Sequence, residues 1–345
     1  MRIDDHNATV AKLRAMYGKR MKVSDYNELA AQRRISDIAE MLRNKQNYSE
    51  TLSGINSNTI HRGMLEDLLR RSIYDNYLKI TSFEHIAGEV FFDYRQIQAE
   101  VREILNAVHY INAKSEQHIE KMPMYLDKLT RFSQIELAKA RTREDLLKAL
   151  VKTPYDDIIA KIPLRKSGKL DYNPIEKALR SYLYEHILSS DYFQTEESKP
   201  LYNLITIDIE LINIINAYRM TEYFEYTPEK IRANMLPFPG KLNSAIRNDL
   251  MNAPDGKEFI ARFSHSYYGR VMTARGIEIN GDLEIEAQKL RYQYARHALH
   301  TSTSPMLSVY AYMFLFETEV NNITTIIEGI RYGLSEKELF DMIII

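Results

Sequence analysis

Two histidines, His297 and His300, have a spacing that could hold a metal ion. They are three residues apart in a segment predicted to be helical, so both imidazoles would lie on one face of the helix. A zinc site needs at least a third protein ligand, and no carboxylate or further histidine occurs on that face nearby. We therefore interpret the two histidines as solvated side chains and predict no metal site.

Acidic residues in strongly apolar segments are a second candidate for ion binding. Asp208 and Glu210 interrupt one apolar run, and Glu317 and Glu319 follow another. Residues two apart on a helix point away from each other, so the members of a pair cannot share one ligand. In each pair we expect one carboxylate to be solvated and the other to line an internal polar face.

The known motifs of catalysis and phosphate binding are absent. Ser167, Gly168 and Lys169 resemble the end of a phosphate loop but lack its upstream glycine, and the HExxH, GxSxG and EF-hand patterns do not occur. Arg165, Lys166 and Lys169 form a basic loop that we interpret as a solvated tip. With no cysteine, thiol catalysis, disulfides and Cys-ligated zinc are excluded. The sequence therefore predicts no catalytic residue and no cofactor.

Composition limits the possible partners. The chain has 345 residues and a formal net charge of −1, which argues against a general nucleic-acid or anionic-membrane surface. Its longest uncharged apolar run, Met306–Phe316, is about half of the roughly 20 residues that span a bilayer, so no direct membrane insertion is expected. The first ten residues include acids and lack an apolar core, so we predict no signal peptide and a cytoplasmic location.

An all-α fold is predicted from the scarcity of Gly (12) and Pro (10) and the abundance of strong helix formers. The clearest helix is Pro305–Leu334. Ser304 can cap its beginning and Gly333 can end it. Ser335 and Glu338 have capping-box spacing and predict a short final helix.

The chain contains an internal repeat of about 110 residues. Each copy has three apolar markers spaced by nine and then four residues, followed by a tyrosine. The markers and tyrosines are Leu29, Ile38, Leu42 and Tyr48; Leu137, Leu146, Leu150 and Tyr155; and Leu250, Phe259, Phe263 and Tyr268.

A polar, turn-prone segment, a helix and then a longer helix follow the markers in every copy. The turn-prone segments are Ser49–Thr59, Asp156–Asn173 and Gly269–Asp282, and the helices after them begin near Leu65, Ile175 and Leu283. The longer helices have apolar stripes at Ile97, Val101, Leu105 and Val108; Ile207, Leu211, Ile215 and Tyr218; and Val320, Ile323, Ile327 and Ile330. We expect Ile215 and Ile327 to be core residues.

Three domains are expected from this repeat: 1–120, 121–231 and 232–345. Their boundaries fall near Glu120–Met124 and near Thr227–Pro239, where prolines are predicted to interrupt helices. Units of this size can bury their own cores. Three similar domains that dock in the same way would form a ring or cone about a pseudo-threefold axis, and a linear row is the alternative.

The segment Glu319–Leu334, EVNNITTIIEGIRYGL, resembles the last long helix of the C subunit of V/A-type rotary ATPases, called the d subunit in eukaryotes. Thr324 replaces a common arginine, and residues 11–16 with 19–21 are similar to the family's Ala-Arg-Val-Arg-Ala-Met element, with Lys12 for an arginine. The matching residues are Asn322, Ile323, Thr325, Ile326, Gly329, Arg331, Tyr332, Gly333 and Leu334.

This resemblance implies a non-catalytic adaptor of a proton- or sodium-transporting ATPase or ATP synthase. It would be a funnel of three helical domains, peripheral on the cytoplasmic face, that joins the D and F subunits of the central stalk to the membrane rotor ring. Two alternatives stay open: a helical-repeat scaffold that binds other proteins, and a helical enzyme that uses His297, His300 and nearby acids around a metal.

Overall fold

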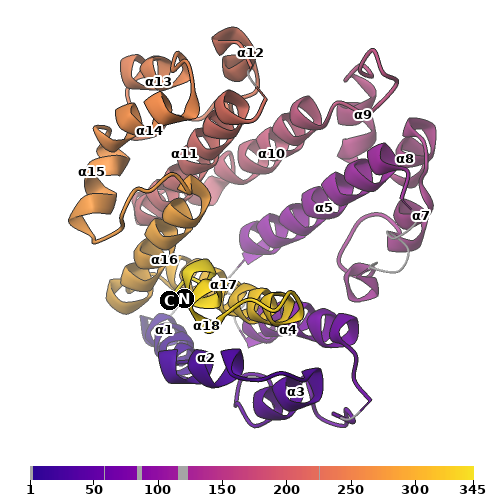
Figure 1. The fold of residues 1–345 in the computed structure, drawn as a ribbon, viewed down its shortest axis with the longest axis vertical. Helices are drawn as coiled ribbons and strands as arrows, with labels where there is room; N and C mark the ends of the chain where they lie inside the picture. Colours follow the sequence, from indigo (N-terminus) through magenta and orange to yellow (C-terminus); the bar gives the residue numbers. More distant parts are fainter. Residues whose placement is uncertain (1–2, 58, 84–87, 116–122, 225) are drawn as a thin grey trace. The chain divides into compact units, whose positions relative to one another are not determined.

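Helices make up all the regular secondary structure in the part of the chain that the computed structural model describes, residues 3–57, 59–83, 88–115, 123–224 and 226–345 (Figure 1). The all-α prediction is therefore confirmed. The chain folds as two compact units, one made of Met1–Gly88 with Tyr268–Ile345 and the other of Glu89–Tyr267.

Most of the predicted boundary at Glu120–Met124 lies outside the described residues, which exclude 116–122. The division into domains 1–120, 121–231 and 232–345 stays a prediction.

In the first unit, the longest helix, α17, packs against most of the others. It contacts α16 along much of its length, and α1, α2, α4 and α18 also pack on it. Segments from opposite ends of the sequence, such as α1 and α17, are thus in contact (Figure 1). The helices are α1 (Ile3–Gly18), α2 (Val23–Ala30), α3 (Ile35–Arg43), α4 (Arg62–Phe83), α15 (Tyr267–Ala274), α16 (Leu283–Thr301), α17 (Pro305–Arg331) and α18 (Glu336–Met342).

The capping residues of α17 act as the sequence predicts, although the helix ends at Arg331 and not at Leu334. The Ser304 hydroxyl accepts a hydrogen bond from a backbone N–H of the first turn, and Pro305 occupies the first turn, where its missing N–H costs nothing. Gly333 has φ of 71°, the left-handed conformation that ends a helix. Ser335 and Glu338 form the predicted capping box of α18. Within the described ranges no helix, α17 included, combines the length and the apolar character that a membrane span needs.

The second unit contains two long helices, α5 and α11. Three short helices, α12, α13 and α14, pack on α11, and α7, α8 and α9 pack in succession, with α9 also against α10. The elements are α5 (Gly88–Ala113), η1 (Met124–Leu126), α7 (Gln134–Lys139), α8 (Arg143–Ala149), α9 (Pro154–Ala160), α10 (Tyr172–Leu188), η2 (Asp191–Gln194), η3 (Glu196–Ser198), α11 (Lys199–Glu222), α12 (Pro228–Ala233), α13 (Ser244–Met251) and α14 (Gly256–Ser264).

The repeat markers are core residues in all three copies. Every marker and the tyrosine that follows it is almost completely shielded from solvent: Leu29, Ile38, Leu42 and Tyr48; Leu137, Leu146, Leu150 and Tyr155; Leu250, Phe259, Phe263 and Tyr268. The spacing of nine and four residues therefore identified three sets of buried positions, which lie mostly on short helices.

Two of the predicted turn-prone segments are wrong in part, because they begin as helix: α9 covers the start of Asp156–Asn173, and α15 covers the start of Gly269–Asp282. For α9, the Thr153 hydroxyl accepts from a backbone N–H and Pro154 follows in the first turn. The prolines of Thr227–Pro239 were expected to interrupt helix, yet Pro228 begins α12 for the same reason.

The prediction that Ile215 is a core residue is also wrong. Ile215 is only half-buried, whereas Ile214 and Ala217 are buried. Ile214 and Ala217 face the same cavity as Leu250 of α13 and Phe259 of α14. The face of α11 that packs toward these helices therefore contains the residues immediately before Ile215 and Tyr218, which belonged to the predicted stripe. Tertiary contacts, which the helical period alone does not specify, select this face.

Truncating Ile327 to Ala should lower the free energy of unfolding by about 2–5 kcal/mol, because Ile327 is completely buried in α17 and its loss leaves a cavity. The matched change Ile215→Ala should cost less than half as much, because that side chain is already partly in water. Urea denaturation midpoints of the two variants measure the difference. Equal losses would show that the register assigned to α11 is wrong.

Candidate functional site

The histidines and the basic loop are on the surface. His297 and His300 are exposed on α16, as predicted, and His300 makes an edge contact with the ring of Tyr17. Within the described ranges, no group of three His, Cys, Asp or Glu side chains is placed to hold a metal ion. Arg165 of the basic loop is exposed and pairs with Asp171.

The acidic pairs differ from the prediction in one case. Asp208 and Glu210 are both buried, so the expectation that one of them is solvated is wrong. The cause is that this part of α11 is buried all the way round: every residue from Leu204 to Leu211 is buried, and not only those of one stripe. In the second pair the expected contrast is present, since Glu319 is buried and Glu317 is partly exposed.

Three buried glutamates, one on each of α5, α11 and α17, have the same role. Each carboxylate accepts a backbone N–H just before a short helix: Glu100 binds the N–H of Arg131, Glu210 those of Lys241 and Leu242, and Glu319 that of Met21. We call these contacts the carboxylate joints. In the first two, the nearest donor lies 31 residues after the acid. In the third, it lies 298 residues before, near the start of the chain.

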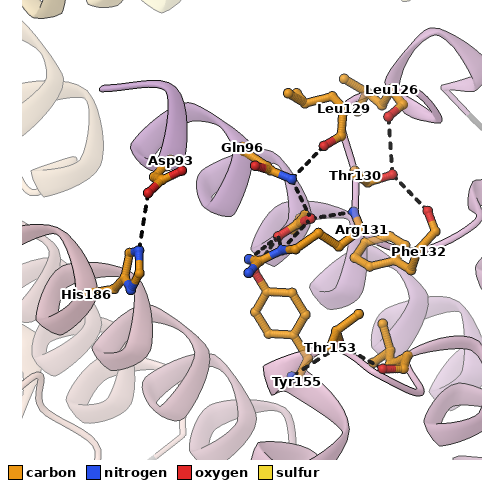
Figure 2. Close-up of polar contacts among 12 residues, drawn as sticks. Asp93, Gln96, Leu126, Leu129, Thr130, Arg131, Phe132, Thr153, Tyr155 and His186 are labelled. Atoms are coloured by element: carbon orange, nitrogen blue, oxygen red, sulfur yellow. Dashed lines mark hydrogen bonds and ion pairs between the residues drawn. The ribbon is translucent and has the colours of Figure 1, made fainter. Parts of the chain in front are cut away.

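The first joint includes an ion pair and a tyrosine (Figure 2). Glu100 is completely buried and accepts from the Arg131 backbone N–H and Nη2, both at 2.6 Å. The Tyr155 hydroxyl donates to the same carboxylate at 2.6 Å. Gln96, one turn before on α5, donates its amide to the Leu129 carbonyl at 2.8 Å and so holds the loop that precedes Arg131.

The pKa values of two residues in this joint are shifted. Burial and then the charge of Glu100 raise the pKa of Tyr155 well above its usual range, so the phenol stays protonated and remains a donor. Burial works against the charge of Arg131, but its hydrogen bond to Glu100 holds the pKa of the guanidinium above its ordinary value.

The second joint explains a glycine. The Glu210 carboxylate accepts from Lys241 N–H at 2.5 Å and Leu242 N–H at 3.1 Å. A Cβ atom at Gly240 would lie 2.1–2.3 Å from the carboxyl atoms of Glu210. Since no side chain fits there, Gly240 is needed for the close approach of this loop to α11, and not for an unusual backbone angle.

The third joint is held by neutral donors. Glu319 accepts from the Met21 N–H at 2.8 Å, the Tyr48 hydroxyl at 2.7 Å and the Asn47 amide at 3.4 Å. Burial raises the pKa of Glu319 above its usual value, although these hydrogen bonds and the charge of Arg20 act in the opposite direction.

An asparagine three residues farther along the helix completes two of the joints. Asn213 exchanges two hydrogen bonds with the backbone of Leu236, at 3.0 and 2.8 Å. Asn322 does the same with Ile344, at 2.6 and 2.9 Å. The same type of side chain therefore anchors the segments that follow α12 and α18.

These arrangements are suited to holding helices together and not to catalysis. Each carboxylate of the joints already accepts at least two hydrogen bonds from backbone or side-chain donors, as expected for acids removed from water. Sequence reasoning singled out Glu210 and Glu319 but missed Glu100. The signal was present, because the 110-residue repeat that aligns the stripes of α5 and α11 also places Glu100 over Glu210.

Similarity to known proteins covers nearly the whole chain. The family model of the ATP synthase (C/AC39) subunit matches residues 9–341. This chain belongs to that family. Relatives of this C/AC39 chain include the C subunits of the A-type ATP synthases of Desulfurococcus sp. (strain SY), 22% identical over 339 residues, and of Methanosarcina mazei, 22% identical over 342 residues. The alignments cover 96% and 97% of this chain and 88% and 92% of the relatives.

The segment Glu319–Leu334, which carried the resemblance to V/A-type C subunits, has clear structural roles in this C/AC39 chain. Glu319 forms a carboxylate joint and Asn322 anchors the segment after α18. A Cβ atom at Gly329 would lie 2.1 Å from a methyl group of Leu339, so the glycine lets α18 pack closely on α17. The motif therefore marks residues that close the core of the first unit.

In the C/AC39 chain, Glu100→Ala should lower the free energy of unfolding by about 3 kcal/mol, because it leaves the partly buried Arg131 and the phenol of Tyr155 without their acceptor. The control is Glu136→Ala, which removes an exposed pair with Lys139 and should cost less than about 0.5 kcal/mol. Urea denaturation measures both. A loss at Glu100 as small as that at Glu136 would contradict the proposed role of the joint.

Stability should also depend on pH through Glu319. The pKa of Glu319 is raised above its ordinary value of 4.5 when the protein folds. At a pH between these two pKa values, the folded state holds a proton on Glu319 that the unfolded state has lost. The free energy of unfolding therefore falls as the pH rises through this range. Glu319→Gln abolishes this titration. The unfolding free energy of the variant minus that of the wild type should therefore increase from about pH 4.5 upward and level off above the raised pKa.

The measurement is urea denaturation of both proteins at a series of pH values up to about 8. Other titrating groups cancel in the difference. A difference that is independent of pH would show that Glu319 has the same pKa in the folded and unfolded states.

Proposed function

We propose that this C/AC39 chain is a non-catalytic central-stalk adaptor of an A/V-type, proton- or sodium-transporting ATP synthase or ATPase. In this role it joins the D and F subunits of the stalk to the membrane rotor ring and turns with them. The observation that carries the proposal is the family match over residues 9–341. The relatives aligned over nearly the whole chain are C subunits of A-type ATP synthases, which supports the same assignment.

The chemistry of the described residues supports a mechanical role. The buried acids that first suggested an ion site are occupied by backbone and side-chain donors that fix helices. Torque transmission requires such rigid connections between elements, because a loosely packed adaptor would twist without passing the rotation on.

The recurrence of the joints supports three similar domains, 1–120, 121–231 and 232–345, arranged as a funnel about a pseudo-threefold axis. Each long helix holds the beginning of the segment that follows its own copy. For α17 the held residue is Met21, at the start of the chain. In a linear row the last long helix would have no such segment to hold, so this contact favours the closed arrangement.

The adaptor would be peripheral on the cytoplasmic face. Its apolar stripes are used in its own core, so the surfaces that meet the stalk and the ring would be largely polar. Such contacts weaken as salt screens them, and salt should therefore release the chain from the complex without detergent. A scaffold that binds unrelated proteins is the competing function.

Deleting the gene should leave a catalytic head that still hydrolyses ATP but no longer moves ions. Restoring the gene on a plasmid is the control. Native mass spectrometry of the purified complex should show one copy of this chain per stalk, bridging stalk and ring. A complex that stays fully coupled without the chain would overturn the proposal and favour the scaffold.

A further inference from the structure

A cavity of about 230 Å³ opens in the second unit between α11 and the short helices that pack on it. Its wall is mostly apolar and is made by side chains of α11, α12, α13 and α14 and of the segment between α12 and α13. Among the residues that form it are Ile214, Ala217, Leu236, Leu250 and Phe259. An apolar cavity of about 150 Å³ in a protein core admits benzene, so this one has room for an aromatic ring.

The corresponding place in the first unit is filled. Helices α2 and α13 both have eight residues and both follow a carboxylate joint. When their first residues are aligned, the buried Leu29 corresponds to the buried Leu250, and Tyr26 corresponds to Arg247. A group bound in the second unit beside Arg247 would therefore take the place that the ring of Tyr26 takes in the first unit.

The surroundings of Tyr26 support this correspondence. Tyr26 is buried, and its hydroxyl accepts from the Asn322 amide at 3.4 Å. Burial and then the charge of Glu319, which lies one turn before Asn322 on α17, raise the pKa of Tyr26. Their equivalents on α11, Asn213 and Glu210, are both on the wall of the cavity.

Arg247 places on the cavity wall a guanidinium without a bonded partner among the described residues. It is half-buried on the cavity wall, and no hydrogen bond or ion pair of its guanidinium occurs in the part of the chain that the structure describes. Arg232, also on this wall, is different, because it bonds to Asn248 and Asn252. A guanidinium next to an apolar wall favours a carboxylate with an attached or adjacent apolar group.

We propose that this cavity binds an aromatic side chain of a partner polypeptide, and that an acidic residue beside that side chain pairs with Arg247. The partner polypeptide would provide the aromatic ring that Tyr26 of this chain provides in the first unit. The proposal rests on the proposed function, in which this chain joins other subunits of one complex. The carboxylate of Glu210 and the amide of Asn213 already hold backbone groups, and Arg232 is bonded to two asparagines, so Arg247 is the charged group on this wall that can pair with the partner.

The test is photo-crosslinking in the intact complex, with benzoylphenylalanine in place of Ser244, an exposed residue on the cavity wall. A crosslink to a partner peptide that has an aromatic residue beside Asp or Glu is expected. Arg247→Tyr should fill the cavity from within and lower this crosslink at least tenfold. The matched control is Ala245→Tyr, which adds the same ring to the exposed side of α13 and should leave the crosslink unchanged.

The thermal midpoint of the isolated Arg247→Tyr chain should equal or exceed that of the wild type, which shows that the variant folds. Three outcomes would each overturn the inference: crosslinks only within this chain, an unchanged crosslink in Arg247→Tyr, or a small aromatic acid retained by the isolated chain in native mass spectrometry.

The experiment also separates this inference from the proposed function. If native mass spectrometry finds the chain outside the rotary complex, the proposed function fails. If the chain is in the complex but Ser244 reaches no partner, only the cavity assignment fails.

Discussion

A carboxylate removed from water is costly unless hydrogen-bond donors surround it, and this constraint organises both units of the protein. On α5, α11 and α17 the donors include backbone N–H groups of the segment that starts a short helix. Because a backbone donor cannot move without its chain, each glutamate fixes the backbone just before a short helix: α7 for Glu100, α13 for Glu210 and α2 for Glu319. The buried positions of Tyr48 and Tyr155, which donate to two of these acids, follow from the same requirement.

The three joints share a geometry but differ in chemistry. Glu100 is compensated by a guanidinium, Glu210 by two successive backbone amides that approach over a glycine, and Glu319 by a phenol, an amide and one backbone donor. The first includes an ion pair with Arg131, whereas the donors of Glu319 are neutral and burial raises the pKa of its carboxyl. The same kind of backbone contact is therefore made with different neighbouring donors.

Periodicity and capping residues were sufficient to predict the helical fold, the caps of α17 and the buried markers such as Leu29 and Phe259. They failed where a neighbouring element decides burial. Ile215 lies on the predicted stripe of α11, but α13 and α14 pack on the adjacent face, which contains Ile214. Glu100 stands among charged residues, like a surface acid, and its role in the core depends on contacts with Arg131 and Tyr155, which its own helix does not reveal.

The first unit is discontinuous, since residues 268–345 complete a core that residues 1–88 begin, while the second unit is one continuous segment. This order has a consequence during synthesis on the ribosome, where segments become available from the N-terminus onward. Helices α1 to α4 leave the ribosome long before α17, and their apolar faces, including Leu13 and Leu69, have no permanent cover in that interval. The second unit can fold first, and the nascent N-terminal helices are then the part of the chain that a chaperone must shield.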